Sequence, residues 1–114
     1  MRFALLYRSG TPETNEPPSA KQMEAIGSLM QEMAQAGVLL GAEGFEPSAN
    51  GVRIRMTSGQ FTVSDGPFPH EDGIVDGYAV VKVTSKAEAI EWSHRFLAAA
   101  GGGESEVRQL REMR

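Results

Sequence analysis

Six short stretches of the chain are typical of β-strands, with strict apolar–polar alternation at residues 52–57 and two apolar faces at residues 2–8, and two longer stretches follow a helical period. We therefore predict strands at residues 2–8, 38–46, 52–57, 61–64, 78–83 and 104–110. Two helices are expected to begin after Ser19 and Ser85, each of which has Gln or Glu three residues later, the pattern of a capping box. Their ends are predicted at Gly37 and at residues 101–103, because Gly readily closes a helix in the left-handed conformation.

The order of these elements is β-α-β, a β-hairpin and a second β-α-β. A tight turn at residues 58–59 joins two of the strands into the hairpin. Removing the hairpin leaves two βαβ units, as in a ferredoxin-like split βαβ sandwich, where both helices cover one face of an antiparallel sheet. The predicted fold class is therefore α+β, a ferredoxin-like split βαβ sandwich with an inserted β-hairpin, in a single domain of residues 1–114.

The first strand is apolar on both of its faces, with Phe3, Leu5 and Tyr7 on one and Ala4 and Leu6 on the other. Helices cover only one face of the sheet in this fold, so the register decides which set is left uncovered. A contiguous uncovered apolar face usually marks an interface. We therefore expect a homodimer formed through the sheet face opposite the helices.

Composition narrows the function classes. The chain of 114 residues is 40% hydrophobic and 23% charged, which is ordinary for a globular domain. Its net charge of −4 argues against nucleic acid as a partner, and the lack of Cys excludes disulfides and thiolate chemistry. No stretch approaches the about 20 apolar residues of a membrane-spanning helix, and the apolar run after Met1 is too short for a secretory signal. We expect a cytoplasmic protein with no membrane partner.

The densest chemistry lies where the strand at residues 61–64 runs into a Gly-Pro turn. Ionisable side chains gather there, namely Asp65, His70, Glu71, Asp72 and Asp76. Asp65 is either the cap of its own turn or a general base facing a pocket. His70 is either an exposed loop residue or the proton partner of Asp65, because imidazole titrates near neutrality. The cluster lacks a second His and any recognised ligand spacing, so no metal site is assigned.

Further residues of the strands are candidates for binding a substrate. Arg53 and Arg55 share one face of their strand, and they either pair across the hairpin or grip an anion, since guanidinium groups bind carboxylates bidentately. Tyr78 can donate a hydrogen bond to a developing oxyanion, with Glu43 as a companion, or simply pack. The loop of residues 9–18 is long for a strand–helix connection and is either a solvated crossover or a lid.

The sequence Asp65-Gly66-Pro67-Phe68 resembles the YCII-related family, specifically its DGPF subgroup. The similarity continues through Gly41-Ala42-Glu43, Val52-Arg53, Gly77-Tyr78, Glu88-Ala89, Glu91-Trp92 and Glu106-Val107-Arg108, and so covers nearly the whole chain. The resemblance implies a dimeric α/β barrel and no firmly assigned activity. The plain YCII branch resembles a His–Asp catalytic arrangement with its His in the first helix, where this chain has Ile26 and no His.

Three functions fit these residues. The first is a cofactor-free small-molecule enzyme that uses acid/base chemistry in a pocket at the boundary of the sheet, the helices and the dimer partner. Asp65 and His70 are its candidate catalytic residues. Arg53, Tyr78 and Glu43 are its candidate substrate-binding residues, for a small anion or carbonyl compound. The second is a non-catalytic ligand-binding or regulatory homodimer, for which the same pocket suffices. The third is a structural interaction module.

Overall fold

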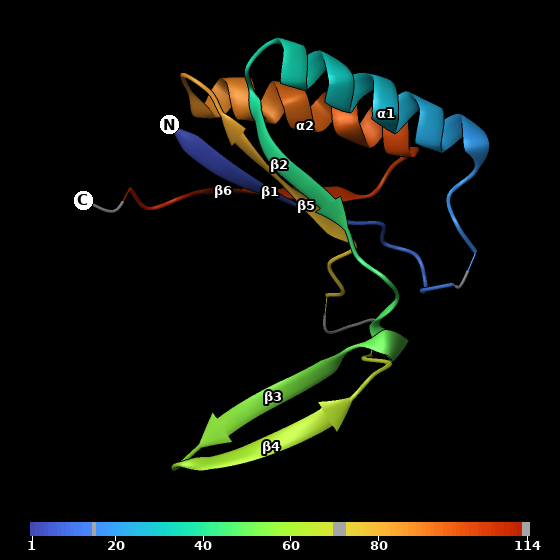
Figure 1. Cartoon of the computed structure of the whole chain (residues 1–114), viewed down its shortest axis with the longest axis vertical. Helices are drawn as coiled ribbons and strands as arrows, with labels where there is room; N and C mark the ends of the chain where they lie inside the picture. The colour runs from blue at the N-terminus through green and yellow to red at the C-terminus, as the bar shows by residue number, and fades with distance from the viewer. Residues whose placement is uncertain (15, 70–72, 113–114) are drawn as a thin grey trace.

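The computed structural model describes residues 1–14, 16–69 and 73–112 (Figure 1). Its elements follow the predicted order: β1 (Arg2–Arg8), α1 (Ala20–Gln35), β2 (Leu39–Gly44), the 3₁₀ helix η1 (Ser48–Asn50), β3 (Val52–Thr57), β4 (Gln60–Asp65), β5 (Gly77–Lys82), α2 (Lys86–Ala100) and β6 (Glu104–Gln109). Among these described segments, neither α-helix has the length and apolar character needed to cross a membrane.

Four strands form one antiparallel sheet in the order β2-β5-β1-β6, and β3 pairs with β4 in a separate two-stranded sheet. Both helices lie side by side on one face of the larger sheet (Figure 1). This arrangement confirms the predicted α+β class and agrees with a ferredoxin-like split βαβ order into which a hairpin is inserted.

The helix caps follow the predicted pattern with one difference. At α1 the Ser19 hydroxyl accepts from the Gln22 N–H at 3.1 Å and the Gln22 side chain accepts from the Ser19 N–H at 3.2 Å, a complete capping box. At α2 the Ser85 hydroxyl accepts from the Glu88 N–H at 3.1 Å. The Glu88 carboxylate, however, binds the N–H and hydroxyl of Thr84, which holds its pKa below the ordinary value. The second predicted capping box is therefore wrong in one of its two hydrogen bonds, because the Glu88 side chain binds Thr84 in place of the Ser85 N–H.

The core lies between the helices and the sheet. It consists of Phe3, Leu5, Leu29, Met33, Val38, Ala79, Val81, Val83 and Ala89. In β1 this places Phe3 and Leu5 on the helix side, opposite Val81 and Ala79 of β5. The register question is thereby settled, because the alternate residues must point to the other side of the sheet.

The sheet face opposite the helices, called the open face below, carries an apolar centre. Ala4 and Leu6 of β1 lie there beside Val80 and Tyr78 of β5, and all four are half-buried rather than buried. No element of the described chain covers this face as the helices cover the other (Figure 1). This is the face through which we expect the homodimer to form.

The β3–β4 hairpin projects away from the helices and the larger sheet (Figure 1). Its turn residues Ser58 and Gly59 have φ of 53° and 78°, the positive values that a tight hairpin turn with right-handed strand twist requires. All residues of both strands are exposed. The radius of gyration is 15.8 Å, against roughly 13 Å for a compact domain of this length. The hairpin is therefore an arm and not part of the core.

Candidate functional site

A cleft of about 980 Å³ opens where β1 and β2 end and β5 begins. The start of α1, the end of α2 and the loop of residues 9–18 complete its walls. Five aromatic side chains line it, namely Tyr7, Phe45, Tyr78, Trp92 and Phe96. Five carboxylates also line it, namely Glu13, Glu16, Glu43, Glu46 and Asp76. Within the described residues, no Lys or Arg side chain contributes to this lining.

Tyr7 is held rigidly at the back of the cleft. Its hydroxyl donates to the Gly102 carbonyl at 3.0 Å, and its ring meets that of Phe96 edge-on at 5.0 Å between centroids. The neighbouring Gly103 has φ of 109°, and a Cβ there would lie 2.8 Å from the Tyr7 ring, so only Gly lets the chain pass. Burial and the negative charge of Asp76 raise the pKa of Tyr7, which keeps the phenol neutral.

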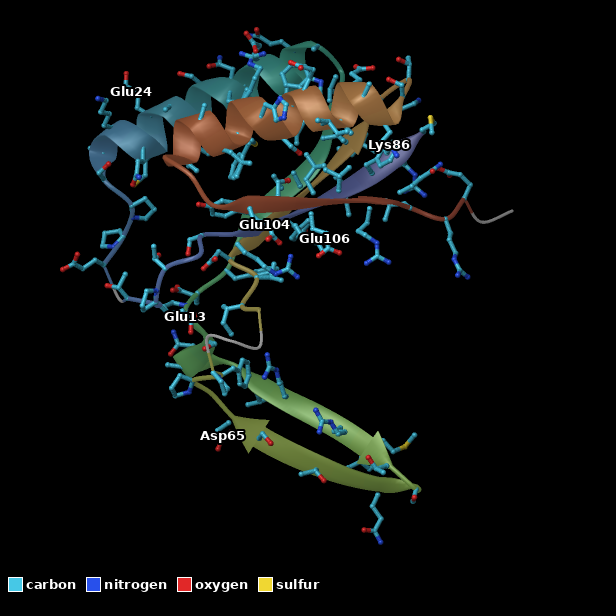
Figure 2. The ribbon with its side chains drawn as sticks, turned by 180° about the vertical axis from the view of Figure 1, so that it is seen from behind. Glu13, Glu24, Asp65, Lys86, Glu104 and Glu106 are labelled. Carbon is cyan, nitrogen blue, oxygen red and sulfur yellow. The ribbon has the colours of Figure 1, made fainter. Side chains whose placement is uncertain are left out.

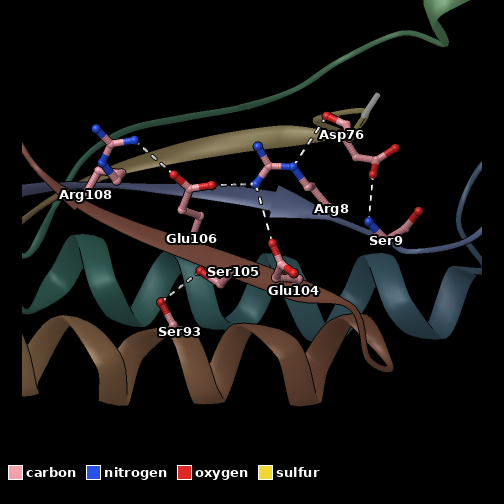
Figure 3. A network of polar contacts seen from close by, with 9 residues as sticks. Arg8, Ser9, Asp76, Ser93, Glu104, Ser105, Glu106 and Arg108 are labelled. Atoms are coloured by element: carbon pink, nitrogen blue, oxygen red, sulfur yellow. Dashed lines mark hydrogen bonds and ion pairs between the residues drawn. The ribbon is translucent and has the colours of Figure 1, made fainter. Parts of the chain in front are cut away.

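Asp76 fixes the mouth of the cleft. Its carboxylate accepts from the Ser9 N–H at 2.7 Å, and its own N–H donates to the Tyr7 carbonyl at 2.7 Å (Figure 3). The loop of residues 9–18 therefore starts from a fixed point before it runs along the cleft wall. The loop lines the cleft, as a lid would. Its hydrogen bonds to Asp76 and Ser48 hold it in place.

Two of the predicted site residues lie side by side at the rim of the cleft, and their side chains leave the sheet on its open face, because Glu43 is opposite Tyr78 and Tyr78 is opposite Leu6. Glu43 of β2 is the direct cross-strand partner of Tyr78 of β5, and both line the cleft. The ring of Phe45 stands 5.9 Å from that of Tyr78. A carboxylate, a phenol and an aromatic surface therefore occupy one end of the sheet, brought there by antiparallel pairing of two strands 35 residues apart in sequence.

Two other predicted residues lie at the base of the hairpin, outside the cleft lining. Arg53 is opposite Ser64 and Asp65 is opposite Val52, so the side chains of Arg53 and Asp65 leave the hairpin on opposite faces. The guanidinium of Arg53 sits 4.0 Å over the ring of Phe68. His70, together with Glu71 and Asp72, lies outside the described residues, so its pairing with Asp65 stays a prediction.

The turn that follows β4 is anchored to η1 (Figure 2). The Phe68 N–H donates to the Ser48 hydroxyl at 3.0 Å, and that hydroxyl in turn donates to the Glu13 carboxylate. The Ser48 N–H also donates to Glu13, at 2.7 Å. A Cβ on Gly66 would lie 1.7 Å from the Ser48 carbonyl oxygen, so Gly is required by close packing. Asp65-Gly66-Pro67-Phe68 is therefore at least a structural joint between the loop of residues 9–18 and the hairpin.

Comparison with known families settles the family of this fold. The sequence profile of the YCII-related domain matches residues 1–114, the whole chain. The chain belongs to the YCII-related family. No curated protein matches it. Within the described residues of this YCII-related chain, no three or more His, Asp or Glu side chains are grouped so that they could hold a metal ion.

The sequence did not point to Tyr7, Glu13 or Ser48 in this YCII-related protein. Tyr7 reads as an ordinary strand residue until the Gly102 carbonyl is placed against its hydroxyl. Glu13 and Ser48 are 35 positions apart in two irregular segments, where no periodicity predicts contacts. Asp76 was recognised only as one member of the acidic cluster. Its place directly before β5 was the available signal.

Proposed function

We propose that this YCII-related protein is a small-ligand-binding homodimer and that its ligand occupies the cleft at the end of the sheet. The observation that carries the proposal is the lining, which joins five aromatic rings to five carboxylates in a volume of about 980 Å³. Ligand sites generally combine apolar and aromatic walls with a few convergent polar groups. Tyr7 supplies such a group from the helix side of the sheet, and Glu43 and Tyr78 supply two more from the rim of the cleft at the open face.

The charge of this lining favours a cationic ligand with an apolar body, such as an organic amine. Carboxylates attract an ammonium group, and aromatic faces bind it through their quadrupole. An anionic ligand would meet negative charge on several sides of the cleft. The anion expected from the sequence was assigned to Arg53, which lies over Phe68 and outside the cleft lining. The proposal therefore moves the ligand from Arg53 to Glu43 and Tyr78.

Benzylamine and benzoate test the proposal, because they have similar size and opposite charge. Titration by calorimetry or by NMR shifts should show benzylamine binding at least about tenfold more tightly, as expected for one favourable charge contact. Glu43→Gln should remove most of that difference. Glu24→Gln, which removes the same charge from an exposed position on α1 (Figure 2), should not. Equal binding of the two probes, or tighter binding of benzoate, would contradict the proposal.

A second candidate function is cofactor-free acid/base catalysis on a small carbonyl or aromatic compound. The cross-strand pairing of Glu43 with Tyr78 favours it, because a carboxylate beside a phenol can move a proton while the phenol binds an oxyanion. In this reading Asp65 and His70 are the catalytic pair. A neighbouring carboxylate favours the imidazolium, so Asp65→Asn should lower the pKa of His70 measured by NMR. An unchanged His70 pKa would show that Asp65 and His70 are not a functional pair, and ligand binding without catalysis would then be the better proposal.

The homodimer of this proposal forms through the open face, where Ala4, Leu6, Tyr78 and Val80 are only half-buried, so Tyr78 lies both at the rim of the cleft and beside the dimer contact. Leu6→Lys places a charge at its centre without touching the helix side of the sheet. Light scattering should find a dimer for the wild-type chain and a folded monomer for this variant. A wild-type monomer at micromolar concentration would overturn the dimer, while the benzylamine titration would still test the ligand.

We also propose that the protein is located in the cytoplasm.

A further inference from the structure

The β3–β4 hairpin carries an apolar face that nothing in the described chain covers. The register places on this face the side chains of Val52, Ile54, Met56, Phe61 and Val63. They make up half of the large hydrophobic side chains that the described chain exposes, and each is more than half exposed. Together they offer roughly 500 Å² of apolar surface, at the upper end of what a monomer normally leaves in one patch.

The hairpin also lacks the support that a two-stranded sheet needs. An isolated hairpin is at best marginally stable in water, and it normally requires a third strand or a packing partner. Here the described contacts hold only its base, where the Gly66 N–H donates to the Gly51 carbonyl at 2.9 Å and Phe68 is bound to Ser48. The strands beyond that base are exposed on both faces. The chain therefore builds an arm whose order depends on a partner.

We infer that the hairpin is an arm of the subunit interface and that a second copy of this chain covers its apolar face. The inference rests on the homodimer proposed above and adds a second contact region to it. A foreign protein is the alternative occupant, and the arrangement of the molecule favours an identical copy over it on two grounds.

The first ground is area and position. The hairpin lies on the open-face side of the larger sheet, the side toward which Glu104 and Glu106 project from β6 (Figures 1 and 2). The hairpin and the open face therefore lie on the same side of the larger sheet. The hairpin face alone is smaller than the about 800 Å² that each partner buries in a standard interface, and the open face adds the half-buried Ala4, Leu6, Tyr78 and Val80 to it. One two-fold contact between identical copies can cover both.

The second ground is charge. The open face is edged by ion pairs that are closed within the chain: Arg8 with Glu106 at 3.0 Å and Glu106 with Arg108 at 3.0 Å (Figure 3), and Arg2 with Glu112 at 3.3 Å. An identical copy brings the same pattern, so an unpaired field of one sign would repel it. Because these charges are already paired, two copies can approach face to face without that repulsion.

Two charge-neutral double variants separate the apolar face from the hairpin itself. Ile54→Lys with Val63→Glu replaces a directly opposed apolar pair by a cross-strand ion pair, which preserves the hairpin. Thr57→Lys with Gln60→Glu makes the same exchange at a directly opposed pair on the polar face. Sedimentation equilibrium should show dimer dissociation at least about 100-fold easier for the first variant than for wild type, because each copy loses two apolar contacts. The control variant should dimerise like wild type.

Every other outcome overturns the inference. Unchanged dimerisation of the Ile54/Val63 variant would remove the hairpin from the interface, and loss of dimer by Leu6→Lys would then still support the sheet-face dimer. Equal weakening in both hairpin variants would show that the apolar face is not the contact. A monomeric wild-type chain would overturn the arm and the proposed dimer together. Circular dichroism checks that the helices of each variant remain folded.

Discussion

The central strand β1 and the β3–β4 hairpin each present an apolar face, and these faces end in opposite environments. Phe3 of β1 is 2% exposed, whereas Phe61 of β4 is 71% exposed. β1 has strands on both sides and two helices over one face. The hairpin has one strand pairing and no layer over either face. The residue pattern of a strand therefore predicts that it has an apolar face, and it does not say what covers that face.

The two regions also differ in how they are tied to the chain. β1 contacts β5, β6 and α2, so its burial follows from the topology of the fold. The hairpin leaves the body between β2 and β5 and is fixed at its base by Ser48 and Phe68. In this account, the body folds on its own contacts and the arm is completed by a second copy. The following predictions test that contrast.

The largest expected difference is between two Phe→Ala variants. Phe3→Ala should lower the free energy of unfolding by about 3–5 kcal/mol, because it leaves a cavity in the core. Phe61→Ala should change it by less than about 0.5 kcal/mol at concentrations where the chain is monomeric. Denaturant unfolding measured at low protein concentration gives both values. Comparable losses in the two variants would mean that the hairpin belongs to the core of a single copy.

A pair of Gly→Ala variants sharpens the contrast at the hairpin base. Gly66→Ala drives a methyl group into the Ser48 carbonyl and should cost about 1–3 kcal/mol by overpacking, with loss of the Phe68 anchor. Gly27→Ala in α1 meets nothing within 4 Å and should stabilise the chain by about 1 kcal/mol. The two melting temperatures should move in opposite directions. A neutral Gly66→Ala would show that the joint with η1 does not constrain the turn.

The smallest expected effect is a pH dependence at the open face. Hydrogen bonds from Arg108 and then Arg8 hold the pKa of Glu106 below its ordinary value of 4.5. A carboxylate with a lowered folded pKa stabilises the chain above the unfolded pKa, and this contribution is lost as the pH falls through the folded pKa. Glu106→Gln should therefore reduce the loss of stability on acidification below about pH 4.5. If the stability of Glu106→Gln fell with pH as that of wild type does, the ion pairs of Glu106 would contribute nothing measurable to folding.

Local patterns predicted the fold because they act over a few residues. The two-sided apolar run at residues 2–8 and the alternation at residues 52–57 predicted the bounds of β1 and β3 as the structure has them, and Ser19 marked the start of α1. The same alternation already implied that Arg53 and Asp65 leave opposite faces of the hairpin, although the candidate site grouped them.

The cleft depends on contacts that local patterns do not encode. Glu13 meets Ser48 across 35 positions, and the Tyr7 hydroxyl meets Gly102 across 95. Phe68 shows the same limit, since its ring is half-buried under the Arg53 guanidinium, a contact that no local pattern encodes. A cation over an aromatic ring can replace part of an apolar cover, and composition alone does not reveal that.

Hydrogen exchange over a dilution series tests the central contrast most directly. Amides of β1 and β5 should keep the same strong protection at every protein concentration, because their hydrogen bonds are completed within one chain. Amides of β3 and β4 should be protected at high concentration and lose that protection as the dimer dissociates. Hairpin protection that does not change with dilution, or that is absent at all concentrations, would contradict the account.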